Sequence, residues 1–212
     1  MTPAPAPIDQ RTSPKHTDRG DFWMVFRKFL KHGTAIATPA PSGRYLVREM
    51  LKTIDFDSAK VIVELGAGTG PITEALIKRV KPHTKLLIVE IEAEFCERLR
   101  RRFPNADIIQ GDAAQMDQLL ADRGISQVDH VVSGLPLPSI PHPIRKAILA
   151  SAARSMGPDG VFRQLTVMPY VYWNFYRNYF EDVTFKLVPL NFPPAGVYLC
   201  KGFKPNAESS SK

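Results

Sequence analysis

The sequence predicts an α/β domain with an open, mostly parallel β-sheet and helices on both of its faces. Two observations lead to this prediction. From residue 60 onward, short apolar runs alternate with helical patterns in five successive units, and two further apolar runs then follow with no helix between them. A chain of 212 residues that is 44% hydrophobic suffices for one domain with a sizeable core. In such a sheet a ligand is expected at the carboxyl ends of the strands.

Both ends of the chain have a different composition from the sheet region. The first residues are rich in proline and poor in large apolar side chains, and the last six read AESSSK, so we expect both ends to be disordered. The chain therefore divides into a leader, a pair of N-terminal helices that cap the substrate side, the α/β domain and a tail, at residues 1–20, 21–54, 55–204 and 205–212.

The first N-terminal helix is expected at residues 22–32, after a potential N-cap at Asp21 and before Gly33. Its aromatic and aliphatic side chains repeat at helical spacing, with basic residues on the other faces. A second helix follows at about 42–53. The α/β units then place strands at 61–65, 86–91, 106–110, 127–133 and 160–168, late strands at 183–188 and 196–201, and helices at 72–80, 92–103, 114–121, 144–156 and 173–180.

Composition argues against several classes of protein. Two cysteines, Cys96 and Cys200, cannot form a disulfide framework, and no CxxC or Cys/His cluster suggests a metal site. No apolar run approaches the roughly 20 residues of a spanning helix, and the N-terminus lacks the apolar core of a signal peptide. We therefore expect no metal, no membrane crossing and a reducing, cytoplasmic compartment.

The net charge of +7 indicates an anionic partner, and its distribution indicates where that partner binds. Residues 1–52 hold nine basic and four acidic side chains, whereas the remaining 160 residues are nearly balanced. The basic N-terminal part is therefore expected to meet the anion.

The strongest local motif is ELGAGTG, residues 64–70, which leaves the first strand and enters a helix. Its three glycines permit positive φ and a close approach of the backbone to a ligand. The spacing differs from the G-x-G-x-x-G of dinucleotide-binding loops, and Glu64 would repel a phosphate but could accept hydrogen bonds from an ammonium group. The loop therefore favours a nucleoside that carries an amino acid.

Two further acidic residues follow the next strands. Glu90 ends the second strand, where a carboxylate can accept the hydroxyls of a ribose, and Asp112 follows the third, where it can accept from an adenine amine. Each has an ordinary alternative, because Glu90 could cap a helix, Asp112 could be an N-cap, and glycines occur in many turns. Their joint occurrence at the ends of consecutive strands favours a nucleoside site.

With this loop, the acidic end of the second strand and the GDA turn, residues 60–201 resemble class I S-adenosylmethionine-dependent methyltransferases. The resemblance implies a Rossmann-like, seven-stranded sheet whose last strand is antiparallel, with S-adenosylmethionine as cofactor and S-adenosylhomocysteine as product. It also implies that Glu90 binds the ribose and that Ile91 packs on the adenine. The methionine portion would be held by Glu64, Leu65, Gly66, Ala67, Gly68 and Gly70, and the adenine edge read by Gly111, Asp112 and Ala113.

The motif after the fourth strand bears on the methyl acceptor. Adenine N6-methylases usually carry Asn or Asp, then Pro-Pro, then an aromatic residue, whereas residues 133–138 read SGLPLP and offer no side chain to stack on a flipped base. Residues 89–99 nevertheless resemble ribosomal RNA adenine dimethyltransferases, so a nucleic-acid adenine N6-methyltransferase is the alternative. The RNA-contacting C-terminal domain of that family has no room here, because the sheet is expected to end at about residue 203.

A narrower resemblance, over about residues 21–204, is to bacterial phospholipid N-methyltransferases. It rests on GTAIATPAPS (33–42), VVSGLPLPSIP (131–141) and NFPPAGVY (191–198). It implies stepwise methylation of phosphatidylethanolamine towards phosphatidylcholine, with a phospholipid substrate and no nucleic acid as partner. Pro41 stands where the family often has the first of two serines, and Pro138 interrupts a usual double leucine. Ser42 and Ser133 are counted on the cofactor side of the site.

The N-terminal helix supports the same interpretation physically. Its aromatic stripe, with Arg27, Lys28 and Lys31 beside it, suits insertion into the surface of an anionic membrane. The alternative is that the stripe packs on its own domain. We expect residues 21–32 to attach the protein peripherally to the inner face of the cell membrane; the oligomeric state is not indicated.

Methyl transfer to an amine needs alignment, exclusion of water and removal of a proton, with no covalent nucleophile. The resemblance implies that the carbonyls of residues 133–135 hold the amine in line. Tyr170 could hydrogen-bond the amine or a lipid phosphate, and His142 could shuttle a proton, although an exposed loop histidine is the simpler interpretation. The candidates on the acceptor side are Tyr45, Ser133, Gly134, Leu135, His142, Tyr170 and Asn191.

Overall fold

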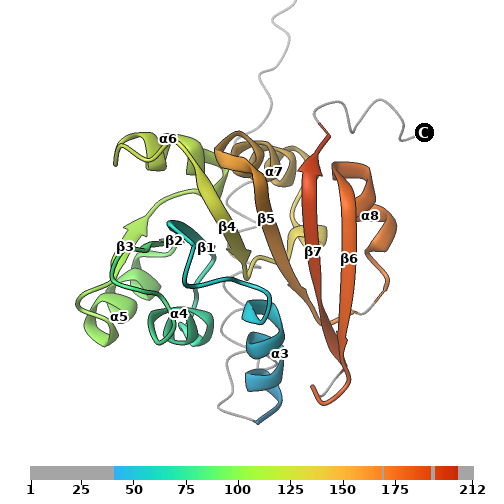
Figure 1. Cartoon of the computed structure of the whole chain (residues 1–212), viewed down its shortest axis with the longest axis horizontal. Helices are drawn as coiled ribbons and strands as arrows, with labels where there is room; N and C mark the ends of the chain where they lie inside the picture. Colours follow the sequence, from blue (N-terminus) through green and yellow to red (C-terminus); the bar gives the residue numbers. More distant parts are fainter. Residues whose placement is uncertain (1–40, 169, 192–193, 205–212) are drawn as a thin grey trace, which may run out of the picture.

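The computed structural model describes residues 41–168, 170–191 and 194–204. They form a three-layer α/β/α domain around a seven-stranded sheet with the strand order β3-β2-β1-β4-β5-β7-β6 (Figure 1). β1 to β5 pair in parallel, and β7 pairs antiparallel with both β5 and β6. The expected seven-stranded sheet with an antiparallel last strand is therefore confirmed.

The strands are short and buried at the centre of the sheet and longer at the β6–β7 edge. Their bounds are β1 Val61–Leu65, β2 Lys85–Glu90, β3 Asp107–Gln110, β4 Val128–Ser133, β5 Met156–Thr166, β6 Phe180–Val188 and β7 Ala195–Phe203. The helices are α3 Pro41–Leu51, α4 Pro71–Ile77, α5 Ala93–Arg102, α6 Met116–Ala121, α7 His142–Ser155 and α8 Trp173–Tyr179, with short 3-10 turns at Ala113–Gln115 and Leu137–Ser139.

Helices cover both faces of the sheet, as the alternating pattern predicts. On one face, α3 and α4 bury a cluster that includes Leu46, Met50 and Ile72 against β1, β4 and β7, and α5 packs beside them. On the other face, α6, α7 and α8 enclose the larger core, which includes Met116 and Ile148. The loops at the carboxyl ends of the parallel strands lie at one edge of the sheet, and this is where a site can form (Figure 1).

Several predicted boundaries are wrong. The helix expected at 144–156 begins at His142 and ends at Ser155, and β5 begins four residues earlier than expected, at Met156. Met156 takes an extended conformation and pairs with Val128, and the register then shifts so that Val161 pairs with His130. The residues between them, Gly-Pro-Asp-Gly, form a bulged entry to the strand that resembles a loop in sequence.

Both late strands are also longer than expected, because Phe180 pairs with Phe203 and Val188 with Ala195 in one antiparallel ladder. The helix expected at 22–32, its aromatic stripe and the leader lie outside the described residues, as does the tail from residue 205. Among the helices that the structure describes, none has the length and hydrophobicity needed to span a membrane.

Candidate functional site

Strand register gathers the predicted residues at the carboxyl edge of the sheet. Leu65, the last residue of β1, pairs with Ser133, the last residue of β4, and Ser133 pairs with Gln164 of β5. Gln164 in turn pairs with Tyr198 of β7. The row places the glycine loop, the SGLPLP loop and the start of β7 next to one another.

The glycine loop between β1 and α4 has the conformation that its sequence predicts. Gly66, Gly68 and Gly70 all have positive φ, between 53° and 88°, where other residues are strained. Gly66 N–H donates to the carbonyl of Val89 at 2.9 Å, so the loop is fixed to the end of β2. The loop therefore lies beside the end of β2, and Gly68 N–H contacts the Glu90 side chain there.

Glu64 is fully buried beneath this loop. Thr73 Oγ1, on α4, donates to Glu64 Oε2 at 2.7 Å, and no group in the described residues donates to Glu64 Oε1. Burial raises the pKa of Glu64 to about 8, and the nearby carboxylate of Glu90 contributes to the increase. A buried acceptor with no donor is expected to be paired in the working state, and an ammonium group would both pair it and favour its ionised form.

Glu90 is also buried, but its carboxylate is already well supplied with donors. Its Oε2 accepts from Gly68 N–H at 2.8 Å, and its Oε1 accepts from the N–H groups of Ile91 and Glu92 at 2.8 and 3.0 Å. Burial raises the pKa of Glu90 while these three hydrogen bonds lower it. A carboxylate has about four acceptor positions. Three of these positions are already used, so the expected pair of ribose hydroxyls would have to share the carboxylate oxygens with the backbone N–H groups, and the role of Glu90 stays a prediction.

The turn after β3 contains Asp112, for which the sequence allows two roles, as the N-cap of the next helix or as an acceptor for the adenine amine. Asp112 is the N-cap of the 3-10 turn, with Oδ1 accepting from Ala114 N–H at 2.9 Å. Gly111 N–H donates to the carbonyl of Glu90 at 3.0 Å, so this turn sits against the end of β2. Ile91 is half-buried at the same edge, and Ala113 is buried. The turn thus lies beside the end of β2, where the side chain of Glu90 contacts Gly68 of the glycine loop.

The loops after β1 and β4 touch backbone to backbone. Gly134 N–H donates to the carbonyl of Leu65 at 2.8 Å, and a Cβ on Gly134 would lie only 2.7 Å from the carbonyl oxygen of Gly66. Leu135 lies over Gly66, and its N–H donates to Ser133 Oγ at 3.3 Å. Glycine at position 134 therefore allows the expected acceptor loop to sit directly on the cofactor loop.

The other acceptor candidates are less closely grouped. Asn191 is buried just before β7, whereas Tyr170 is exposed beyond β5 with a φ of 64° and its ring centroid 4.6 Å from that of Phe185. Tyr45 is partly exposed on α3, and Ser42 belongs to the first turn of that helix. His142 is exposed at the first position of α7, which agrees with the simpler interpretation of this residue.

Sequence reasoning missed Gln164. This residue is buried, and its Nε2 donates to the carbonyls of Leu135 and Leu165 at 2.6 and 3.0 Å, while its Oε1 has no donor in the described part of the chain. A glutamine within an apolar strand, in GVFRQLTVM, was the available signal. Gln164 fixes the orientation of the Leu135 carbonyl, one of the three expected to hold the amine.

Arg163, the preceding residue, was also missed and faces the opposite layer. It is buried, and its guanidinium donates to Thr53 Oγ1 and to the Thr53 carbonyl at 2.6 and 3.1 Å. Burial lowers the pKa of Arg163 to about 10, a value at which it remains charged near neutral pH. Arg163 thus ties β5 to the segment after α3, the helix that carries Tyr45.

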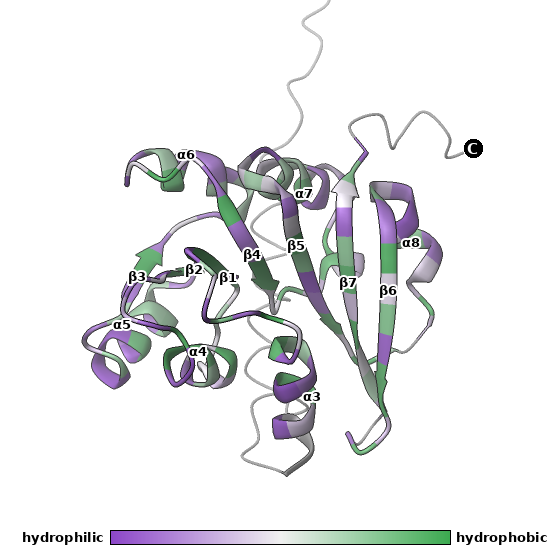
Figure 2. Ribbon diagram, viewed as in Figure 1, coloured by the Kyte–Doolittle hydropathy of each residue, from purple (hydrophilic) through white to green (hydrophobic). Residues whose placement is uncertain are grey.

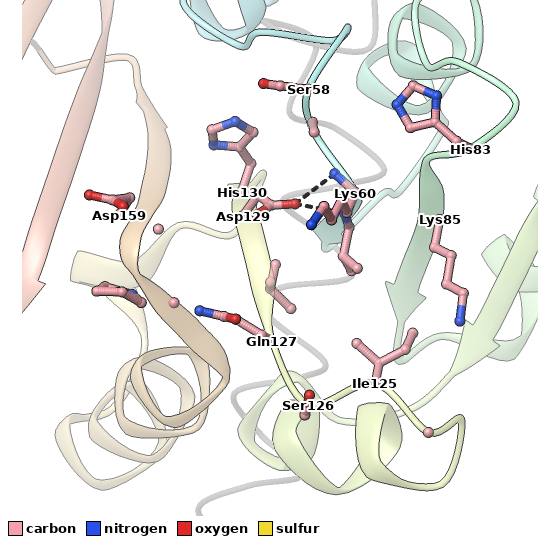
Figure 3. Close-up of a pocket in the computed structure, with 17 residues that line it drawn as sticks. Ser58, Lys60, His83, Lys85, Ile125, Ser126, Gln127, Asp129, His130 and Asp159 are labelled. Atoms are coloured by element: carbon pink, nitrogen blue, oxygen red, sulfur yellow. Dashed lines mark hydrogen bonds between the residues drawn. The ribbon is translucent and has the colours of Figure 1, made fainter.

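A cavity of about 600 Å³ lies at the opposite, amino edge of the sheet (Figure 3). Its lining includes Lys60, Lys85 and His130, and the Asp129 carboxylate there accepts from the backbone N–H groups of Lys60 and Val61. None of the predicted site residues lines it. The glycine loop opens at the other edge, so this cavity is separate from the candidate site.

Within the described ranges, no group of three or more His, Cys, Asp or Glu side chains could hold a metal ion. Both cysteines are buried and unpaired, and burial raises the pKa of the Cys96 thiol to about 11. Neither thiol lies in a setting that would activate it as a nucleophile.

Comparison with known proteins identifies the family. Residues 62–160 match the profile of a methyltransferase domain. The chain is also 46% identical, over 187 residues, to an ornithine lipid N-methyltransferase from Singulisphaera acidiphila, a match that covers 87% of this chain and 97% of that protein. The chain belongs to the class I S-adenosylmethionine-dependent methyltransferases. The expected fold class, the cofactor and the transfer of a methyl group are thereby confirmed for this enzyme.

Other relatives are more distant. The methyltransferase is 28% identical to the ribosomal RNA small subunit methyltransferase A of Mycoplasma capricolum over 95 residues, which span only 34% of that protein. Two solved structures share its fold. A didemethyltoxoflavin N1-methyltransferase from Burkholderia thailandensis has a TM-score of 0.67, 15% identity and coverage of 94% and 95% of the two chains. A phosphoethanolamine N-methyltransferase from Haemonchus contortus has a TM-score of 0.68 and 16% identity over 94% of this chain and 52% of that one.

The residues of the methyltransferase fit its cofactor. Glu64 Oε1 is a buried acceptor suited to the ammonium of the methionine portion, and the three glycines take the positive φ that this turn requires, with Leu135 packed over Gly66. Asp112 and Ile91 lie where an adenine would extend along the ends of β2 and β3. The assignment of each side chain to one part of the cofactor stays a prediction.

Proposed function

We propose that this methyltransferase transfers methyl groups to the primary amine of a membrane lipid. The observation that carries the proposal is the 46% identity to an ornithine lipid N-methyltransferase along 97% of that protein's length. The loop after β4 supports it, because SGLPLP has neither the Asn or Asp nor the aromatic side chain that adenine methylases usually carry there.

Two lipids present the required group. An ornithine lipid is favoured by the named relative, and phosphatidylethanolamine, methylated stepwise towards phosphatidylcholine, is favoured by the three segments that resemble phospholipid N-methyltransferases. Both carry a primary amine beside an anionic or polar headgroup. The two candidates therefore require the same chemistry at the carboxyl edge and differ in the headgroup that the site must accommodate.

The chain's own residues would align the amine and remove water. When bound, S-adenosylmethionine supplies an electrophilic methyl group on a sulfonium. The Leu135 carbonyl accepts from Gln164 Nε2 at 2.6 Å and from Leu137 N–H at 2.9 Å, so both of its acceptor positions are used and the loop after β4 is held in one conformation. An ammonium donating to the carbonyl of Ser133 or Gly134 would then lie beside the glycine loop, in line for transfer.

The amine must also lose a proton before attack. The buried amide oxygen of Gln164 has no donor among the described residues and can accept a hydrogen bond from the amine, but an amide does not take up a proton at neutral pH. His142 is the histidine among the acceptor candidates, and it is exposed to solvent. We infer that the proton passes to water at the rim of the site.

The proposal includes attachment to the membrane. Residues 21–32 would lie in the surface of an anionic bilayer on the cytoplasmic side, with Trp23 and the phenylalanines inserted and the lysines and arginine near the headgroups. Each basic residue near such a surface contributes about 1 kcal/mol at low salt. Removal of residues 1–32 should abolish sedimentation with anionic vesicles while S-adenosylhomocysteine still binds.

The test of the activity compares three acceptors. The full chain is incubated with methyl-labelled S-adenosylmethionine and with vesicles containing phosphatidylethanolamine, vesicles containing an ornithine lipid, or ribosomal RNA. Label in either lipid supports the proposal and identifies the substrate. Label in RNA alone would replace it with the nucleic-acid alternative that the partial match to ribosomal RNA methyltransferases leaves as the second candidate.

A further inference from the structure

The exposed large hydrophobic side chains of the described residues gather at one edge of the molecule. Leu190, Val171 and Tyr170 expose 66%, 61% and 61% of their surface, which is unusual for side chains of this size in one region. We call the full set the apolar rim: Tyr45, Met168, Tyr170, Val171, Leu187 and Leu190.

The topology of the sheet explains why these residues are neighbours. Residues 168–171 follow the carboxyl end of β5, and 187–190 lie at the end of β6 and in the connection to β7. Thr166 of β5 pairs with Gly196, and Val188 of β6 pairs with Ala195, so both segments meet at the start of β7. The lower ends of β5, β6 and β7 lie beside α3, which carries Tyr45 (Figures 1 and 2).

Local structure holds the rim open to solvent. Tyr170 is the residue other than glycine with positive φ in the described part of the chain, and its ring lies against Phe185. Phe185 in turn contacts Tyr198, with ring centroids 4.8 Å apart. These tilted rings therefore connect Tyr170 to β6 and β7, and Val171 next to it is exposed.

The charges around the rim favour a surface with negative groups. The two connecting segments, 166–173 and 187–195, contain no acidic residue. Lys186 is exposed directly before the second segment, and Arg44 and Arg48 are exposed on α3 on either side of Tyr45. Exposed aromatic and aliphatic side chains flanked by cations are typical of proteins that lie in the headgroup region of a bilayer.

We propose that the apolar rim is a membrane-contacting surface, with Val171 and Leu190 inserted among the lipids and the cations of α3 and β6 at the headgroups. The inference rests on the proposed lipid substrate and adds a contact separate from residues 21–32. This contact would orient the carboxyl edge of the sheet towards the bilayer. A lipid amine would then reach the row formed by Ser133, Gln164 and Tyr198 while its acyl chains remain in the membrane.

The test uses a fluorescent probe placed on the rim of the full-length protein. Leu190→Cys and, as a matched control at the opposite edge, Ser126→Cys are labelled with an environment-sensitive dye. The two native cysteines are buried with raised thiol pKa values, so labelling is directed to the new site. The vesicles contain phosphatidylcholine and phosphatidylglycerol, which carry no primary amine, so the reading does not depend on methyl transfer.

We expect a blue shift at position 190 and none at position 126 when vesicles are added. In a second measurement, Val171→Asp with Leu190→Asp should weaken vesicle binding at least tenfold, because one leucine-sized side chain moved out of water contributes about that factor. The exposed pair Asn105→Asp with Ser126→Asp, at the amino edge, should bind as the wild type does. S-adenosylhomocysteine binding, unchanged in both variants, shows that they are folded.

Other occupants of the rim predict different results. If a second copy of the chain covers it, Val171→Asp with Leu190→Asp lowers the molar mass in solution and the dye shifts with protein concentration instead of with vesicles. If the chain's own residues 1–40 cover it, the dye is already blue-shifted in water and vesicles change nothing. Either result overturns the proposal, and neither bears on whether a lipid amine is methylated in detergent.

Discussion

Replacement of Glu64 by glutamine tests how the buried carboxylate under the glycine loop affects cofactor binding and how it affects the stability of the fold. The glutamine would keep the size of the side chain and an oxygen that can accept from Thr73 Oγ1. It would also place an NH₂ donor where Glu64 Oε1 now stands without a partner. An NH₂ group cannot accept from the cofactor's ammonium, so the charge-assisted hydrogen bond is lost.

We expect Glu64→Gln to weaken binding of the cofactor product and to increase the stability of the protein at high pH. A hydrogen bond to a charged group contributes about 1.5–3 kcal/mol, so S-adenosylhomocysteine should bind roughly 10- to 150-fold more weakly to Glu64→Gln. Stability should change in the other direction. The pKa of Glu64 is raised from 4.5 to about 8 in the folded protein. Its contribution to the free energy of unfolding therefore decreases as the pH rises between these values, by up to about 5 kcal/mol. Glutamine avoids part of this loss, and we expect Glu64→Gln to be about 2 kcal/mol more stable at pH 8.5.

Calorimetry with S-adenosylhomocysteine and urea unfolding at pH 8.5 measure the two effects, with the exposed Glu97→Gln on α5 as control. Weaker binding together with equal or greater stability supports the role given to Glu64. Unchanged affinity would refute the reasoning, because Glu64 would then not contact the cofactor. Weaker binding with a large loss of stability would show that the carboxylate supports the fold instead.

Three further predictions concern the contact between the two loops at Gly134, the link from Arg163 to Thr53, and the proton held by Glu64. Gly134→Ala should weaken S-adenosylhomocysteine binding at least tenfold, because the added Cβ would lie 2.7 Å from the carbonyl oxygen of Gly66. The control Ser139→Ala, at an exposed position in the same connection, should bind as the wild type does. Equal affinities of the two variants would contradict the contact between the two loops. Arg163→Met should speed amide hydrogen exchange in 41–53 and lower the free energy of unfolding by about 1 kcal/mol, because it removes the hydrogen bonds that tie β5 to Thr53, whose exposed acceptors can then bind water; unchanged exchange would show that Arg163 does not hold this segment. The affinity of the wild type for S-adenosylhomocysteine should fall as the pH drops below about 8, because Glu64 then holds a proton that binding must release. Calorimetry at pH 7 in two buffers of different ionisation enthalpy should detect the released proton. A binding enthalpy that is the same in both buffers would exclude this linkage.

The parts of the site that the sequence predicts are those with local causes. The glycine loop, the acidic ends of β1 and β2 and the N-cap at Asp112 each depend on a few consecutive residues, and the alternation of strands and helices places them at one edge. Asp112 is confirmed as an N-cap by the hydrogen bond from Ala114 N–H to its Oδ1, whereas its contact with adenine stays a prediction.

The residues that the sequence does not reveal depend on partners far along the chain. Gln164 matters because strand register places it beside Ser133 and its side chain reaches Leu135, 29 positions earlier. Arg163 finds its acceptors on Thr53, 110 positions away. The start of β5 at Met156 is set by pairing with Val128, which overrides the loop-like Gly-Pro-Asp-Gly that follows it.

The proposal that this enzyme methylates a lipid amine is tested most directly by separating lipids on a thin-layer plate after incubation with methyl-labelled S-adenosylmethionine. The full chain should place label in an ornithine lipid or in phosphatidylethanolamine, in products that advance stepwise with time, and Glu64→Gln should reduce the rate at limiting cofactor. Label confined to ribosomal RNA, with none in either lipid, would contradict the account.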